Sequence, residues 1–149
     1  RAAVESKMFD EVMVSTDSEK YADIAVECGA CVPFLRSLSN AGDKASSWDV
    51  VREVIDKYYE RGESYDTVAL LQPTSPLRNS QHIREGYQLM KEKKANAVVA
   101  VTAEEHSPLW SNTLPRDRNM RGFIRPEVLG RPRQELEEYY RINGALYIL

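Results

Sequence analysis

A short polar loop carries the residues with the clearest chemical potential in this sequence. Gln72-Pro-Thr-Ser-Pro-Leu-Arg78 follows an apolar run and contains an amide, two hydroxyls and a guanidinium. Its two prolines restrict the backbone and reduce the mobility of these groups. Such a set suits a polyhydroxylated or phosphorylated ligand, which makes Gln72, Thr74 and Ser75 candidate contacts. The alternative is an ordinary turn whose polar residues only cap neighbouring elements.

A second polar segment leads into the N-terminus of an expected helix. It reads Arg36-Ser-Leu-Ser-Asn-Ala-Gly-Asp-Lys-Ala-Ser-Ser47. Free backbone N–H groups and the helix dipole favour an anion at such a position. Ser46 or Ser47 can equally serve only as the cap of that helix. Asp17, which follows an earlier apolar run, can recognise a base, help neutralise a metal or cap the next helix.

The basic residues change type along the chain. Residues 95–149 contain seven arginines and no lysine, and seven acidic residues balance them. Arginine grips a carboxylate or phosphate through two parallel hydrogen bonds, whereas lysine acts as a point charge. The stretch therefore indicates an anionic ligand. The alternative is a set of solvated arginines that pair with Asp117 and Glu127.

Cysteine and histidine give weaker signals. Cys28 and Cys31 form a C-x-x-C, but the pair falls where a helix ends, and no second pair completes a zinc site. We interpret both as partly buried free thiols. His82 and His106 are not spaced as metal ligands and have no evident triad partners, so surface or supporting roles are expected.

Apolar periodicity indicates the elements that must position these residues. It predicts helices at residues 16–28 and 46–60, and a third helix capped by Ser80. Short apolar runs predict strands at residues 12–14, 30–35, 67–71, 97–101 and 145–149. This alternation is typical of the α/β class with a doubly wound, mostly parallel sheet. Such sheets bind ligands beyond the carboxyl ends of their strands, where the polar segments above lie.

Length and charge exclude several classes of protein. The chain has 149 residues, 20 basic and 23 acidic side chains, and a net charge of −3. That size suits a single domain, and no apolar run approaches the roughly 20 residues of a membrane helix. The charge disfavours nucleic acid as a partner, and the first residues do not resemble a signal peptide. Two cysteines exclude a disulfide scaffold and favour a cytoplasmic location.

Several of these segments together resemble one family, the acylneuraminate cytidylyltransferases or CMP-N-acetylneuraminic acid synthetases. The matching segments follow the family's order over nearly the whole chain. They are Phe9-Asp10, Val14–Asp17, Leu35-Arg36, Asp43–Ser47, Leu70–Arg78, Arg131–Gln134 and Asn143–Tyr147. The resemblance implies a Rossmann-like nucleotidyltransferase fold. It also implies transfer of CMP from CTP to the anomeric hydroxyl of a nine-carbon 2-keto sugar acid of the N-acetylneuraminate type, with release of pyrophosphate.

The resemblance assigns residues to the nucleotide. Arg36, the Ala45 backbone and Ser47 match positions that hold the cytosine and the ribose in the family. Asp17 lies in a neighbouring matched segment and is placed with them. No catalytic side chain is assigned.

The sugar acid takes a second set of residues. Gln72 matches a residue that contacts the sugar acid, and Arg133 matches the one that binds its carboxylate. The further candidates for this pocket are Thr74, Ser75, Gln134, Arg141, Asn143 and Tyr147. The segments around Arg133 and Asn143 favour a nine-carbon acid.

Two features of the family have no counterpart in these residues: a phosphate loop similar to Leu-Ala-Arg-x-x-Ser-Lys-Gly, and a pair of aspartates for Mg²⁺. We therefore expect residues 1–149 to form one cytidylyltransferase domain that is incomplete at both ends. Mg²⁺ is expected in the full-length enzyme, with ligands outside this chain. The isolated chain is expected to have little or no synthetase activity, which pyrophosphate release from CTP and sialic acid would contradict.

Residues 107–138 match the family's dimerisation arm, so we expect a homodimer. Structureless loops of this length are uncommon in a compact monomer. Alternative substrates are 3-deoxy-manno-octulosonate, legionaminate and pseudaminate. The alternative from another class is a non-catalytic nucleotide-binding or dimerisation domain.

Overall fold

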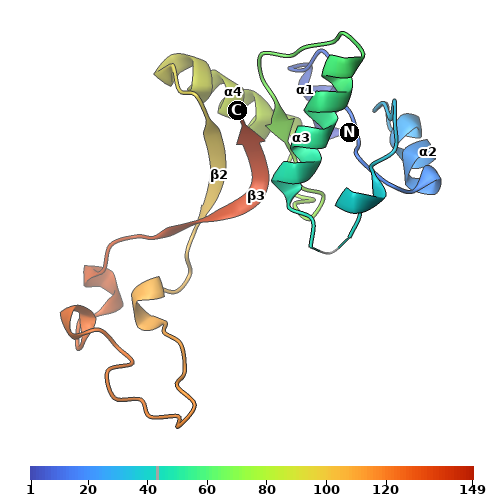
Figure 1. Ribbon diagram of the computed structural model, residues 1–149. Helices are drawn as coiled ribbons and strands as arrows, with labels where there is room; N and C mark the ends of the chain where they lie inside the picture. The colour runs from blue at the N-terminus through green and yellow to red at the C-terminus, as the bar shows by residue number, and fades with distance from the viewer. Residues whose placement is uncertain (43) are drawn as a thin grey trace.

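The computed structural model describes residues 1–42 and 44–149, so Asp43 of the predicted nucleotide segment lies outside the described residues. Helices dominate the N-terminal two thirds, and a three-stranded sheet joins them to a long extension (Figure 1). The elements in chain order are α1 (Ala2–Ser6), α2 (Glu19–Glu27), η1 (Leu38–Asn40), α3 (Ser47–Glu60), β1 (Ala69–Leu70), α4 (Ser80–Lys93), β2 (Val98–Ala103), η2 (Pro108–Trp110), η3 (Pro126–Val128), η4 (Arg133–Glu135) and β3 (Tyr140–Ile148).

Local hydrogen bonds set where the helices begin. Ser46 caps α3 by accepting a hydrogen bond from the Trp48 N–H at 3.1 Å. The predicted cap of α4 is wrong by one residue, because Asn79 rather than Ser80 accepts from the backbone of its first turn. His82 completes a capping box by accepting from the Asn79 N–H. The histidine therefore has a structural role at a helix end.

The sheet is antiparallel, which corrects the prediction of a mostly parallel, doubly wound sheet. Its order is β1-β3-β2, and β3 runs antiparallel to both neighbours. Consequently β1 and β2 run in the same direction and are joined through α4, as strand–helix–strand alternation predicts. No α-helix separates β2 from β3, so the chain turns back and β3 enters between the other two strands.

The two predicted N-terminal strands shrink to a single parallel bridge between Met13 and Cys31. The Val14 N–H donates to the Cys31 carbonyl at 3.0 Å, and the Cys31 N–H donates to the Val12 carbonyl at 2.8 Å. Pro33 follows closely and has no N–H to extend the pairing. Among the described residues, parallel pairing is limited to this bridge.

The core lies between α4 and the sheet. Ile83 of α4 and Ile148 of β3 are fully buried, and Leu146 and Ala3 complete the cluster. Burial of such side chains contributes about 1.5–3 kcal/mol each. Gly86 allows this close packing, because a Cβ there would lie 2.6 Å from Leu146 Cδ2. The core thus fixes β3, the strand that carries several predicted site residues.

A long excursion separates β2 from β3. The two strands remain paired as far as the Glu104 N–H, which donates to the Tyr139 carbonyl at 2.7 Å. Residues 105–138, which we call the arm, then extend away from the helices with only η2, η3 and η4 along them (Figure 1). Leu129 of the arm is 70% exposed. No helix of the described residues is both long and apolar enough to cross a membrane.

Candidate functional site

The polar loop packs against β3 through an unusually close approach. The Gln72 N–H donates to the Gly144 carbonyl at 3.4 Å, and Ser75 Oγ donates to the Asn143 carbonyl at 3.5 Å. Gly144 has φ 73°, and a Cβ on it would lie 2.1 Å from Gln72 Oε1. The structure therefore brings together Gln72, Ser75 and Asn143, which the sequence places about 70 positions apart. Thr74 is exposed in the same loop.

Tyr147 joins this group to the N-terminus of α3. Its ring meets that of Trp48 edge to face, with centroids 5.4 Å apart and an interplanar angle of 83°. Trp48 directly follows Ser47, the predicted ribose contact, which is exposed at the first position of α3. Ser47 of the predicted nucleotide set therefore directly precedes the residue that contacts Tyr147 of the predicted sugar-acid set.

Arg36 packs against Ser15 and Thr16, the two residues that precede Asp17. Its backbone N–H donates to the Thr16 carbonyl at 2.8 Å, and its Nε donates to Ser15 Oγ at 3.0 Å. A further guanidinium nitrogen donates to the Ser15 carbonyl. Asp17 is exposed beside Thr16. The two segments predicted for the nucleotide are therefore neighbours, and the Arg36 side chain is already oriented.

Ala45 occupies a tight turn. Its N–H donates to the Gly42 carbonyl at 3.0 Å, so that donor is engaged within the chain. A role of the Ala45 backbone towards cytosine stays a prediction.

Sequence reasoning missed Glu53 of α3. Its carboxylate accepts from the Ser37 N–H at 2.8 Å, Ser37 Oγ at 2.8 Å, Asn40 Nδ2 at 2.6 Å and Lys57 Nζ at 2.6 Å. These donors, Lys57 first, hold the pKa of Glu53 at about 2. Lys57 also donates to the Leu35 carbonyl at 3.0 Å. Glu53 and Lys57 thus hold Ser37 and Leu35, the residues on either side of Arg36. In the sequence, only the i,i+4 spacing of Glu53 and Lys57 could have indicated this ion pair.

The surface beside Glu53 does not suit a triphosphate. A depression there is lined by four carboxylates and two cationic side chains, which give it an excess of negative charge. Its charged residues are Asp49, Glu53, Asp56 and Glu60 with Arg52 and Lys57. An anionic ligand would be repelled from this face of α3.

Arg133, the residue predicted to bind the carboxylate of the sugar acid, lies apart from Gln72, Ser75 and Asn143. Arg133 and Gln134 are exposed in η4, within the arm, which extends away from the helices (Figure 1), while Gln72 packs against Gly144 in the middle of β3. Arg141 lies at the base of the arm, with its Nε 3.6 Å from a Glu104 carboxylate oxygen. A single copy of the chain therefore does not bring Arg133 to the other sugar-acid candidates.

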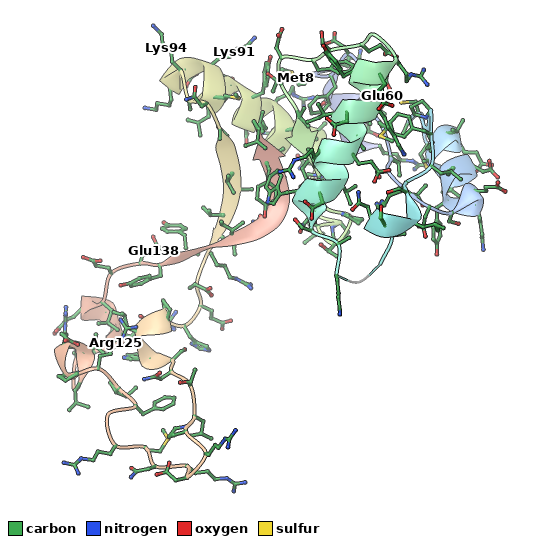
Figure 2. The ribbon with its side chains drawn as sticks, viewed as in Figure 1. Met8, Glu60, Lys91, Lys94, Arg125 and Glu138 are labelled. Atoms are coloured by element: carbon green, nitrogen blue, oxygen red, sulfur yellow. The ribbon has the colours of Figure 1, made fainter. Side chains whose placement is uncertain are left out.

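The arm arginines are not neutralised by nearby carboxylates. Among the described residues, neither Asp117 nor Glu127 forms an ion pair with an arginine, although the arginines of the arm are exposed, as that alternative also expects. Arg125, labelled in Figure 2, is exposed and lines a depression of the arm together with Glu127, Arg131 and Glu137. Guanidinium groups in this state remain available to an anionic partner.

The cysteines are free, as predicted, and one belongs to a hydrogen-bonded cluster. Cys31 Sγ donates to Glu11 at 2.9 Å, and the hydroxyls of Tyr58 and Tyr65 donate to the same carboxylate. Burial and the neighbouring Glu11 raise the pKa of the Cys31 thiol to about 12. A thiol held neutral in this way is a poor nucleophile, which agrees with a structural role for Cys31.

Among the described residues, no three histidine, cysteine, aspartate or glutamate side chains gather in a way that could hold a metal ion. The expected requirement for Mg²⁺ stays a prediction.

A family model described as Cytidylyltransferase matches residues 1–144. The chain belongs to the cytidylyltransferase family. It is 37% identical to a CMP-N,N'-diacetyllegionaminic acid synthase of Legionella pneumophila, over 99% of this chain and 62% of that protein. It is also 37% identical to an N-acylneuraminate cytidylyltransferase of Escherichia coli, over 99% of this chain and 34% of that protein.

A pseudaminic acid cytidylyltransferase of Campylobacter jejuni is 30% identical over 97% of the chain, which covers 62% of that relative. The chain thus spans about a third to three fifths of the length of these relatives. The family resemblance seen in the sequence is confirmed.

Proposed function

We propose that this cytidylyltransferase chain takes part in the transfer of CMP from CTP to the anomeric hydroxyl of a nine-carbon 2-keto sugar acid. The hydroxyl oxygen attacks the α-phosphorus, the bond from that phosphorus to the β-phosphate oxygen breaks, and pyrophosphate leaves. The hydroxyl proton passes to solvent. The observation that carries the proposal is the packing of the polar loop against Asn143 and Gly144 of β3, the strand whose Tyr147 contacts Trp48 in the N-terminal turn of α3.

Positioning accounts for the contribution of these residues. Phosphoryl transfer depends on alignment of the two substrates and on neutralisation of charge. Arg36 and Ser47 with Asp17 and the Ala45 backbone would hold the nucleoside, and the loop from Gln72 to Ser75 would hold hydroxyl groups of the sugar acid. Both groups of residues lie on elements fixed by packing or by Glu53.

The names of the relatives support an acidic sugar as acceptor. We propose a nine-carbon acid, and a panel of N-acetylneuraminate, legionaminate, pseudaminate and 3-deoxy-manno-octulosonate tests it. CMP transfer by the intact protein should favour one of the first three. A preference for 3-deoxy-manno-octulosonate would overturn this choice.

A homodimer belongs to the same proposal. Arg133 and Gln134 lie in the arm, apart from the remaining sugar-acid candidates of their own chain. An arm that reaches a second copy would carry its unpaired arginines to that copy, where Arg133 could bind the carboxylate of the acid. Light scattering that gives a monomer for the intact protein would contradict this part of the proposal.

Binding of CTP provides the direct test of the nucleotide site. Calorimetry with Arg36→Ala should show affinity for CTP lowered about tenfold or more, because a charged hydrogen-bond donor is lost. Arg52→Ala is the matched control, since Arg52 is an exposed arginine on α3 whose nearest carboxylate, Asp49, is 3.7 Å away. Absence of CTP binding by the unaltered protein would instead favour a non-catalytic domain.

The location and the metal complete the proposal. Free thiols fit a cytoplasmic enzyme, because disulfides are rare in a reducing compartment. We expect that chelation of Mg²⁺ abolishes CMP transfer by the intact protein and that added Mg²⁺ restores it. Transfer that persists in the chelator would contradict the metal requirement.

A further inference from the structure

Arg78 ends the polar loop and has no assigned role. Its Nη1 donates to two carbonyl oxygens, that of Gln72 at 3.0 Å and that of Ala145 at 2.8 Å. Gln72 begins the loop, whereas Ala145 lies in β3. One guanidinium nitrogen therefore bridges the start of the loop to the strand.

The bridge lies beside the close contact between Gln72 and Gly144, since Ala145 directly follows Gly144. The Gln72 N–H donates to the Gly144 carbonyl, and a side chain on Gly144 would collide with Gln72. The Arg78 N–H closes the loop on itself by donating to the Ser75 carbonyl at 3.2 Å. Small shifts of Arg78 would therefore move Gln72 relative to Asn143, which precedes Gly144.

The charge of Arg78 is not used in an ion pair. Within the part of the chain that the structure describes, no carboxylate lies within 4.0 Å of its guanidinium. Its Nε is buried without a hydrogen-bond partner, and burial lowers the pKa of the group. Partial burial of a cation without a carboxylate partner costs free energy of folding, which other interactions of the residue must offset. The bridge between two backbone carbonyls is one such interaction.

We propose that Arg78 is a positioning residue, which holds Gln72 and Asn143 at the spacing that the sugar acid requires. This inference rests on the proposed function, because it assigns the loop and β3 to the sugar acid. Arg78 acts through the backbone of its neighbours. Its unpaired charge also makes the potential around the loop more positive, which favours an acidic substrate.

Two substitutions separate the bridge from general packing. Arg78→Met keeps an unbranched side chain but removes every donor, whereas Arg78→Lys keeps a charged donor that can reach carbonyl oxygens. Arg84→Met is the matched control, since Arg84 is exposed on α4. Thermal unfolding of each variant checks that the substituted protein remains folded.

The decisive measurement is the KM for each substrate in CMP transfer by the intact protein, with the best acid of the four-member panel. Arg78→Met should raise the KM for the acid about tenfold and leave that for CTP within twofold, while Arg78→Lys restores part of the loss. Equal changes for both substrates, or no change, would overturn the inference.

Hydrogen exchange supplies a second readout that does not need substrate. In Arg78→Met, amides of residues 72–75 and 143–147 should exchange faster than in the unaltered protein, and Arg84→Met should leave them unchanged. If the unaltered protein transfers no CMP but the exchange effect is present, the proposed function fails while the bridge stands. Unchanged exchange in Arg78→Met would contradict the proposal that Arg78 holds the loop to β3.

Discussion

Single atoms decide how closely the polar loop approaches β3. Gly144 has φ 73° and contributes no side chain, so the Gln72 amide can occupy the space where a Cβ would be. Positive φ favours glycine, yet strain alone does not explain the position, because several glycines of this chain share it. What distinguishes Gly144 is the presence of Gln72 Oε1 at that place.

Gly144→Ala should therefore weaken binding of the sugar acid about tenfold, because the new methyl group displaces Gln72. Gly62→Ala is the control, since Gly62 has φ 80° but open space around it and lies outside both the arm and the candidate site. The control carries the same backbone strain of about 1 kcal/mol without the collision. Calorimetry on both variants checks the difference, and equal losses would show that strain alone matters.

Helix α3 is the element that organises the predicted nucleotide side. Through Glu53 and Lys57 it holds the residues that flank Arg36, and through Trp48 it contacts Tyr147 of β3. Helix α4 fixes the opposite side, because Ile83 and Gly86 pack on β3. The site therefore depends on two helices that hold it from different directions.

Acid should release the contact made by Glu53. Its folded pKa of about 2 lies below the ordinary value of 4.5, so its stabilisation is present above about pH 4.5 and is lost as the pH falls towards 2. Thermal unfolding at pH 7 and pH 3 checks this. Glu53→Gln should lower the Tm clearly at pH 7 and less at pH 3. Glu60→Gln, an exposed change on the same helix, should have little effect at either pH.

The packing of α4 on β3 leaves no room for a side chain at Gly86. Gly86→Val places carbon atoms where Leu146 and Ile148 already lie, and overpacking of this kind costs about 1–3 kcal/mol. Gln88→Val introduces the same side chain at an exposed position of α4 and controls for helix propensity. Urea unfolding should show the larger loss for Gly86→Val. Equal losses would place the cost in the helix alone.

The whole molecule consists of a packed helical part and an arm that leaves it between β2 and β3. The arm exposes Leu114, Met120 and Leu129 together with arginines that lack a carboxylate partner within the described residues. A contact with a second copy would remove these apolar side chains from water and give the arginines a partner. This is the physical basis for proposing that the arm contacts a second copy.

Leu129→Lys should shift the intact protein from dimer towards monomer, because a charge would have to be buried in the contact. Light scattering at several concentrations measures the shift. Leu77→Lys, an exposed leucine of the polar loop outside the arm, is the control and should leave the mass unchanged. A mass that is the same for all three proteins would contradict an arm-mediated dimer.

The sequence by itself determined the family, the positions of α2, α3 and α4, and the segments around Gln72 and Asn143 that meet in space. These follow from local signals: apolar periodicity, caps, and motifs that keep their order along the chain. Helix boundaries differ by only one to three residues, since competing polar side chains such as Asn79 decide the cap.

Only the tertiary structure decided the direction of β3, the contacts of Glu53 and the bridge made by Arg78. An apolar strand pattern is the same in parallel and antiparallel pairing, so the sequence does not give the direction of β3. That direction follows from the path of the chain, which returns from the arm and pairs β3 antiparallel to β2. Glu53 and Arg78 are a helix-surface carboxylate and a loop cation in the sequence. Their roles depend on carbonyls and donors brought near by the fold, which spacing along the chain does not encode.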